Sequence, residues 1–142
     1  MRFYAAGNYY LSSIQQGIQS AHVLAEIAIM PEYKGVFDEW AKNHKTMVLL
    51  NGGNADGLRK FYELLSSEYA KSLPFAKFNE DAQSLDGALT SVGVIVNERL
   101  YEAVWINGYD QTEGWWQAAN GERLHGWEDE FVTALKGMPL AR

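Results

Sequence analysis

Hydrophobic and polar residues follow one another along the chain in patterns that predict both strands and helices. Short, mostly apolar runs indicate strands, and runs with apolar residues three and four positions apart are typical of amphipathic helices. Strands are expected at Arg2–Ala6, Thr46–Leu50, Pro74–Phe78 and Leu89–Val96. Helices are expected at residues 14–29, 33–43 and 58–69, with a short closing helix at residues 127–135. Because Thr46–Leu50 is a continuous apolar run, we expect that strand to be covered on both faces.

The order of these elements is β-α-α-β-α-β-β, followed by the closing helix. Strands that alternate with helices indicate an α/β protein, here with a mixed sheet of four strands and helices on both faces. We expect one domain over residues 1–142, with a core at residues 1–96 and an aromatic-rich extension at residues 97–142. The extension should pack on the core, because about 45 residues rarely form a hydrophobic core of their own.

The extension is the most aromatic part of the chain. Four of the five tryptophans follow residue 100, and glycines recur among them. Large amphipathic side chains are favoured where one edge is buried and the other meets a partner, so we expect this segment to enclose a ligand or to form a homo-oligomer. Trp115 and Trp116, which glycines flank, can stack on a nucleobase; the alternative is an aromatic contact with the sheet or with another subunit.

Composition excludes several classes of site. The chain has no cysteine, which excludes disulfides, thiolate metal sites and cysteine nucleophiles. Its histidines have no partners at metal-ligand spacing, and we expect neither a metal nor a cofactor. No segment approaches the roughly 20 apolar residues of a membrane helix. Residues 1–10 lack the basic and apolar regions of a signal peptide, so a cytoplasmic location and no membrane partner are expected.

The charge of the chain argues against a large nucleic-acid partner. The net charge is −6, and residues 97–142 contain four basic side chains against eight acidic ones. Proteins that bind nucleic acid normally present a basic patch, because neutralised phosphates supply much of the affinity. We therefore expect a small ligand, with tRNA as a partner only for a hydrolase.

The first predicted helix contains one polar stripe. Gln15, Gln19, His22 and Glu26 are spaced four, three and four residues apart, which places them on one face. The remaining positions, Ile14 and Ile18 among them, are mostly apolar, and we expect them to be largely buried. The stripe then lines a polar pocket or faces solvent. Ser12 and Ser13 are expected to cap the start of this helix.

A second candidate lies after the second strand. The turn from Asn51 through Gly52 and Gly53 to Asn54 precedes a helix, so its amides can face an anion at the helix N-terminus. The alternative is a turn with no ligand, and no Walker sequence follows it.

Residues 15–22 resemble the first-helix signature of the type II peptidyl-tRNA hydrolases, in which a lysine is followed by three small or apolar residues, a glutamine, two residues and a histidine. Gln19 and His22 match the glutamine and the histidine. The resemblance covers residues 2–96 and extends to the order of elements, with Asp81 after the third strand and Thr90 in the fourth. It implies that family's fold and, for a hydrolase, His22, Asp81 and Thr90 as catalytic residues.

This sequence departs from the family at the lysine, where it has Gln15. A neutral amide cannot supply the cation that the lysine is thought to place at the scissile ester. Our first hypothesis is therefore a protein that holds a nucleotide-like ligand without turnover, by analogy a phage protein that sequesters a host immune nucleotide signal in the host cytoplasm. The alternatives are a peptidyl-tRNA hydrolase and an oligomeric interaction module. The predicted ligand-binding residues are Gln15, Gln19, His22, Asn51, Asp81, Thr90, Trp115 and Trp116.

Overall fold

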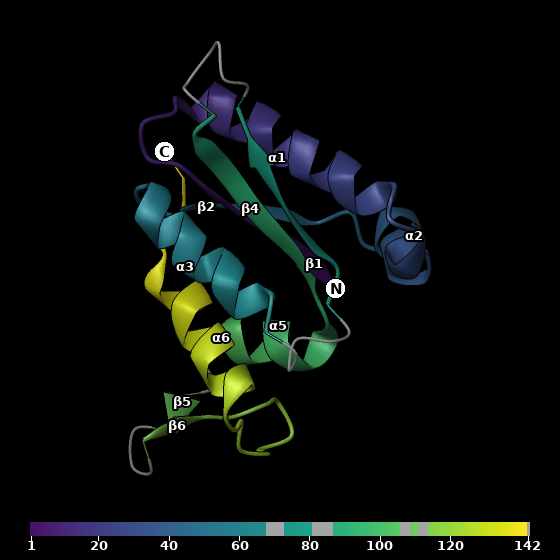
Figure 1. Ribbon diagram of the computed structural model, residues 1–142. Coiled ribbons are helices and arrows are strands. Elements are labelled where there is room, and N and C mark those ends of the chain that lie inside the picture. The colour runs from purple at the N-terminus through teal and green to yellow at the C-terminus, as the bar shows by residue number, and fades with distance from the viewer. Residues whose placement is uncertain (68–72, 81–86, 106–108, 111–113, 142) are drawn as a thin grey trace.

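The fold is built around a mixed four-stranded sheet (Figure 1). The computed structural model describes residues 1–67, 73–80, 87–105, 109–110 and 114–141. The strands are β1 (Arg2–Gly7), β2 (Met47–Asn51), β3 (Phe75–Asn79) and β4 (Leu89–Val96), in the order β2-β1-β4-β3. β1 is parallel to β2, and β4 is antiparallel to both β1 and β3. The predicted mixed sheet of four strands is confirmed.

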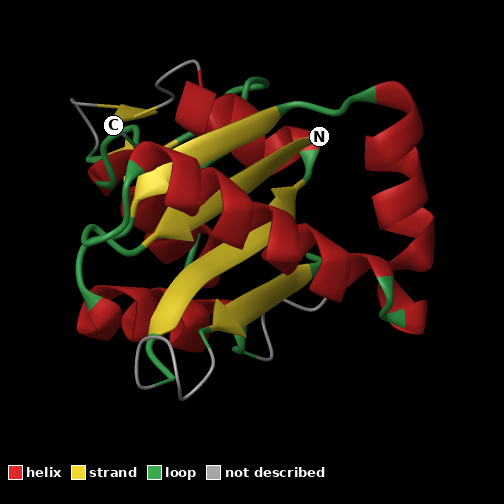
Figure 2. Cartoon of the chain, turned by 90° about the horizontal axis from the view of Figure 1, so that it is seen from above, coloured by secondary structure: helices red, strands yellow, loops and turns green. Residues whose placement is uncertain are grey.

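Helices cover both faces of this sheet, as predicted (Figure 2). One face packs against α1 (Ser13–Ala28) and α2 (Lys34–Asn43), which the short helix η1 (Pro31–Tyr33) joins. The other face packs against α3 (Ala55–Leu65), α5 (Glu98–Trp105) and α6 (Trp127–Gly137). No helix in the described ranges is both long enough and apolar enough to cross a bilayer.

β4 is the central element of the core. Each of its eight residues is buried, which requires neighbours on both faces and on both edges. Val92, Val94 and Val96 belong to the hydrophobic cluster on the α3 side, whereas Ile95 belongs to the cluster on the α1 side. This alternation follows from the period of two in a strand.

The residues after 97 complete the α3 side of the core. Trp116 and Phe131 lie in the same hydrophobic cluster as Leu58 and Phe61 of α3. Two elements that the sequence pattern did not predict are found here, helix α5 and a ribbon of β5 (Tyr109–Asp110) with β6 (Trp115–Trp116). The extension therefore shares its core with the sheet.

Ion pairs of Arg99 join α5 to α6 and to the segment that contains Glu122. The Arg99 guanidinium on α5 donates to Glu128 on α6 at 2.8 and 3.2 Å, and its Nη1 lies 2.9 Å from Glu122. The hydrogen bonds that Arg99 donates to Glu128 and Glu122 raise the pKa of Arg99 above its ordinary value, and the same bond from Arg99 lowers the pKa of the Glu122 carboxyl. The arginine stays charged at any pH at which the protein is folded.

The expectation that the second strand is covered on both faces holds in part, because Val48 packs against the cluster on the α3 side and Leu49 against the cluster on the α1 side. β2 is an edge strand, in which Leu50 is buried but Met47 is 42% exposed. The end of the chain protects part of its free edge: the Ala141 amide donates to the Leu49 carbonyl at 2.9 Å, and the Asn51 amide donates to the Pro139 carbonyl at 2.7 Å. An apolar run thus indicated a strand correctly but not its position in the sheet.

Gly93 in β4 sets how closely α1 approaches the sheet, and this can be tested. A Cβ at this position would lie 2.7 Å from the Phe3 ring and 2.8 Å from Val23 Cγ1. We expect Gly93→Ala to lower the free energy of unfolding by about 1–3 kcal/mol, the usual cost of overpacking. Gly35→Ala in α2 is the matched control, because a Cβ there meets no atom within 4 Å. Urea unfolding followed by circular dichroism measures both variants, and equal stabilities would contradict the argument.

Candidate functional site

The N-terminal half of α1 covers the sheet where β1 ends and β4 begins. Gly7 closes β1 opposite Ser91 of β4, and the Asn8 amide then donates to the Thr90 carbonyl at 2.9 Å. All six buried polar side chains among the described residues belong to these three segments. They are Asn8, Gln16, Gln19, Ser20, Thr90 and Ser91, which we call the α1–β4 polar cluster. Buried polar groups are costly unless they are hydrogen-bonded, so their concentration in one place needs an explanation.

Gln19 joins α1 to both strands of the β3–β4 pair. Its Nε2 donates to Glu80 Oε2 at 2.9 Å, and the Thr90 hydroxyl lies 3.5 Å from its Oε1. The same hydroxyl lies closer to the Phe78 carbonyl, at 3.0 Å. Because a hydroxyl has one proton and 3.5 Å is long for such a bond, Gln19 Oε1 keeps most of its capacity to accept. The predicted residues Gln19 and Thr90 are thus brought together.

Two further polar atoms of the cluster are buried without a partner. Gln16 Nε2 donates to the Leu11 carbonyl at 3.0 Å, but Gln16 Oε1 and Ser91 Oγ make no hydrogen bond within the described segments. Both lie on the α1 side of the sheet, since Gln16 Oε1 is 3.2 Å from the place of a Cβ at Gly7, the residue paired with Ser91. An unsatisfied buried group costs about 1–3 kcal/mol, so the fold bears this cost at both atoms.

His22 lies one helical turn beyond Gln19 at the rim of the cluster. Its ring stacks on Phe78 with 4.4 Å between centroids and 11° between planes. The His22 side chain is exposed, and in the described part of the chain it makes no hydrogen bond. The aromatic pair therefore presents a flat, accessible surface beside the buried polar groups.

The predicted burial of α1 is wrong for Ile14 and Ile18. Ile14 is 78% exposed and Ile18 is 51% exposed, whereas Gln16, Val23 and Ile27 are buried. The buried residues recur at intervals of seven and four and therefore form one face of the helix. Of the predicted stripe, Gln19 is buried, whereas Gln15, His22 and Glu26 lie on the exposed side.

Gln15 has a local role at the start of α1. Its Oε1 accepts from the Ser12 amide at 3.0 Å, and its own amide donates to Ser12 Oγ at 3.2 Å. This reciprocal pair is a capping box, which confirms Ser12 as the predicted cap. The Gln15 side chain is thus engaged with the helix end.

Three other predicted residues, Asn51, Trp115 and Trp116, do not join the cluster. Asn51 closes its own turn by accepting from the Gly53 amide at 2.9 Å. Trp116 donates to Thr133 at 2.9 Å within the α3-side core, and Trp115 lies under the Arg123 guanidinium at 4.1 Å, in a ribbon beside α6 (Figure 1). Asp81 lies outside the described residues.

Four members of the cluster were missed from the sequence: Asn8, Gln16, Ser20 and Ser91. A signal for Gln16 existed, because it is seven and eleven residues before the apolar Val23 and Ile27 and so shares their face. Asn8 lies two residues after the predicted strand Arg2–Ala6 and directly after β1 as observed. Ser91 lies inside an apolar strand, where the neighbouring sequence does not distinguish a functional side chain from one that only fills space.

The electrostatic character of the cluster is acceptor-rich. Glu80 is its charged neighbour, and α1 contains no lysine or arginine. No group of three or more histidine, aspartate or glutamate side chains in the described ranges is placed to hold a metal ion. With free amide oxygens, hydroxyls and a carboxylate, the cluster can bind a ligand that offers N–H donors.

The comparisons with known proteins give no family. No protein-family model matches the chain, and no curated protein matches it. The resemblance to the type II peptidyl-tRNA hydrolases therefore stays a prediction, and the case for a function depends on the geometry of the α1–β4 polar cluster.

Proposed function

We propose that the protein binds a small nucleotide-like ligand at the α1–β4 polar cluster and holds it without turnover. The observation that supports this proposal is the gathering of every buried polar side chain of the described residues under one half of α1. Two of their atoms, Gln16 Oε1 and Ser91 Oγ, are buried without a partner in the described residues, and a bound ligand would satisfy them if local opening admits it.

The chemistry of the cluster favours recognition through a base. Amino and imino N–H groups of a nucleobase are suited to Glu80, to Gln16 Oε1 and to Gln19 Oε1. The exposed His22–Phe78 pair offers a stacking surface at the rim. Because neither α1 nor the described residues bonded to the cluster include a cation, phosphates would extend into solvent and add little affinity.

Such a protein would act by removing its ligand from solution. In line with the phage analogy, we propose sequestration of an immune nucleotide signal in a host cytoplasm as the biological role. Mass spectrometry of the small molecules that copurify with the protein identifies the ligand.

Gln19→Ala tests the site. We expect it to weaken binding by about 1–3 kcal/mol, because ligand groups and Glu80 lose their partner. Titration calorimetry with adenosine, guanosine and their monophosphates measures this, and each nucleoside should bind about as well as its monophosphate. Gln15→Ala, which alters only the helix cap, is the matched control. A Gln19→Ala protein that melts earlier but binds unchanged per folded molecule would show that the cluster is structural.

The hydrolase alternative makes the opposite prediction. Because Gln15 supplies no cation, we expect peptidyl-tRNA cleavage well below the ~1 s⁻¹ of an ordinary enzyme. An assay with purified peptidyl-tRNA measures the rate, and turnover at or above that level would refute binding without turnover. A gain of activity in Gln15→Lys would identify a site that has lost its catalytic cation.

An exposed apolar face of α1 supports the predicted homo-oligomer. Ile14, Ile18 and Ile29 are exposed on one face of this helix with Ala21 and Ala25 between them. The only charged side chain of α1 is Glu26, so a second copy can pack antiparallel on this face without like-charge contact, with Ile18 opposite Ala25.

Ile18→Glu should therefore shift the protein towards monomer in light scattering at high micromolar concentration. Leu140→Glu is the control, because Leu140 is 65% exposed but far from α1 in the sequence and bridged to β2. A wild-type protein that is monomeric under these conditions would contradict the α1 interface.

A further inference from the structure

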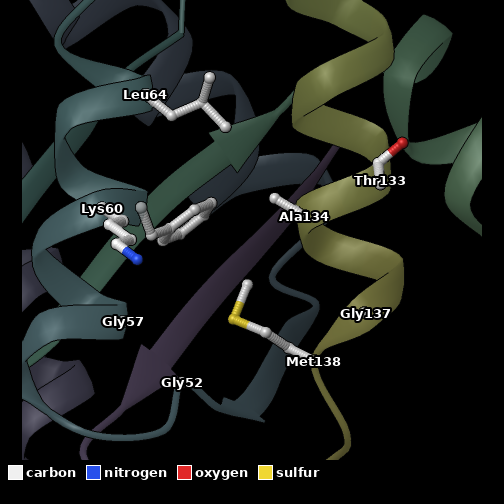
Figure 3. A pocket seen from close by; sticks show the side chains of 9 residues that line it. Gly52, Gly57, Lys60, Leu64, Thr133, Ala134, Gly137 and Met138 are labelled. Atoms are coloured by element: carbon white, nitrogen blue, oxygen red, sulfur yellow. The ribbon is translucent and has the colours of Figure 1, made fainter.

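A cleft lies between α3 and α6, on the side of the sheet opposite α1 (Figure 3). Its volume is about 410 Å³, within the range of small-molecule sites. Its lining comes from both helices and from the turns beside them: Gly52, Gly57, Lys60, Phe61, Leu64, Thr133, Ala134, Gly137 and Met138. None of these residues belongs to the α1–β4 polar cluster.

Small residues on the two helices leave this space open. Gly52 and Gly57 are required by packing, because a Cβ at Gly52 would overlap Leu58 and a Cβ at Gly57 would lie 2.8 Å from the Gly52 carbonyl oxygen. Gly137 is different, since a Cβ there would meet no atom within 4 Å. Packing therefore does not require glycine at position 137, yet any larger residue would project into or beside the cleft.

The lining combines an apolar surface with one cation. Phe61, Leu64, Ala134 and Met138 supply the apolar part, and Figure 3 shows Met138 reaching between the helices. Lys60 is the only charged residue of this lining and has no ion-pair partner within the described ranges. The neighbouring acid Asp56 is paired with Arg59 instead.

Acidic side chains determine at which end of the groove an anion can bind. A second hollow of about 570 Å³ continues along the groove from Lys60 and Leu64 towards Trp127, and Glu63 and Glu130 line it. Two carboxylates at that end repel an anionic group, whereas Trp127 offers apolar surface. An anion is thus favoured beside Lys60 and an apolar tail along the groove.

We infer that the α3–α6 cleft binds a small amphipathic carboxylate, with its carboxylate on Lys60 and its hydrocarbon part against Phe61, Leu64 and Met138. This site is independent of the proposed nucleotide-like ligand, which is bound on the other side of the sheet. The two ligands differ in chemistry. The ligand of the cleft carries a hydrogen-bond-accepting carboxylate and an apolar body, whereas a nucleobase offers N–H donors.

The test compares octanoate with 1-octanol by titration calorimetry and by shifts of protein NMR signals. Octanoate should bind more tightly than the alcohol, and Lys60→Gln should weaken octanoate about tenfold while leaving the alcohol unchanged. Lys60→Arg should retain the preference for the anion. Equal affinity of the wild-type protein for both probes would overturn the role of Lys60.

Filling the cleft is the second part of the test. Gly137→Leu should abolish binding of both probes, and Gly137→Ala should weaken it without loss of stability. Gly35→Leu on α2 is the matched control, because its Cβ also meets no atom within 4 Å and it is remote from the cleft. If octanoate binds a folded Gly137→Leu protein as well as it binds the control, the cleft is not its site.

Discussion

The close approach of α1 to the sheet is the constraint on which the candidate site depends. It is possible because β1 ends in Gly7 and β4 contains Gly93, positions at which a side chain would collide with Gln16 or with Phe3 and Val23. Because the helix lies this close to the sheet, the side chains on its inward face are buried whether they are apolar or polar. The result is an apolar contact around Val23 and a polar one around Gln16, in successive turns of one helix.

The opposite face of the sheet is closed by the extension. Because Phe131 and Trp116 share a hydrophobic cluster with α3 and with β4, the residues after 97 bury apolar surface that the first four strands and three helices alone would expose. The aromatic residues expected to meet a ligand are used instead in this packing, with Trp116 bonded to Thr133 and Trp127 donating to the Leu64 carbonyl at 2.7 Å.

The sheet separates the two proposed sites, which differ in their chemistry. On the α1 side, amide oxygens, hydroxyls and Glu80 form a surface for hydrogen-bond donors. On the α3 side, Lys60 stands in an apolar cleft with carboxylates at one end.

The sequence by itself determined the four strands of the sheet and the helices α1, α2, α3 and α6, because strand and helix patterns and the Ser12 cap are local properties of neighbouring residues. It also named Gln19 and Thr90, which the structure brings together. It did not determine which face of α1 is buried, since isoleucines at 14 and 18 compete with Val23 and Ile27 for the interior. Only the tertiary structure decided this, because the approach of Gly93 to Val23 and the contacts of Gln19 with Glu80 and Thr90 join residues more than 60 positions apart.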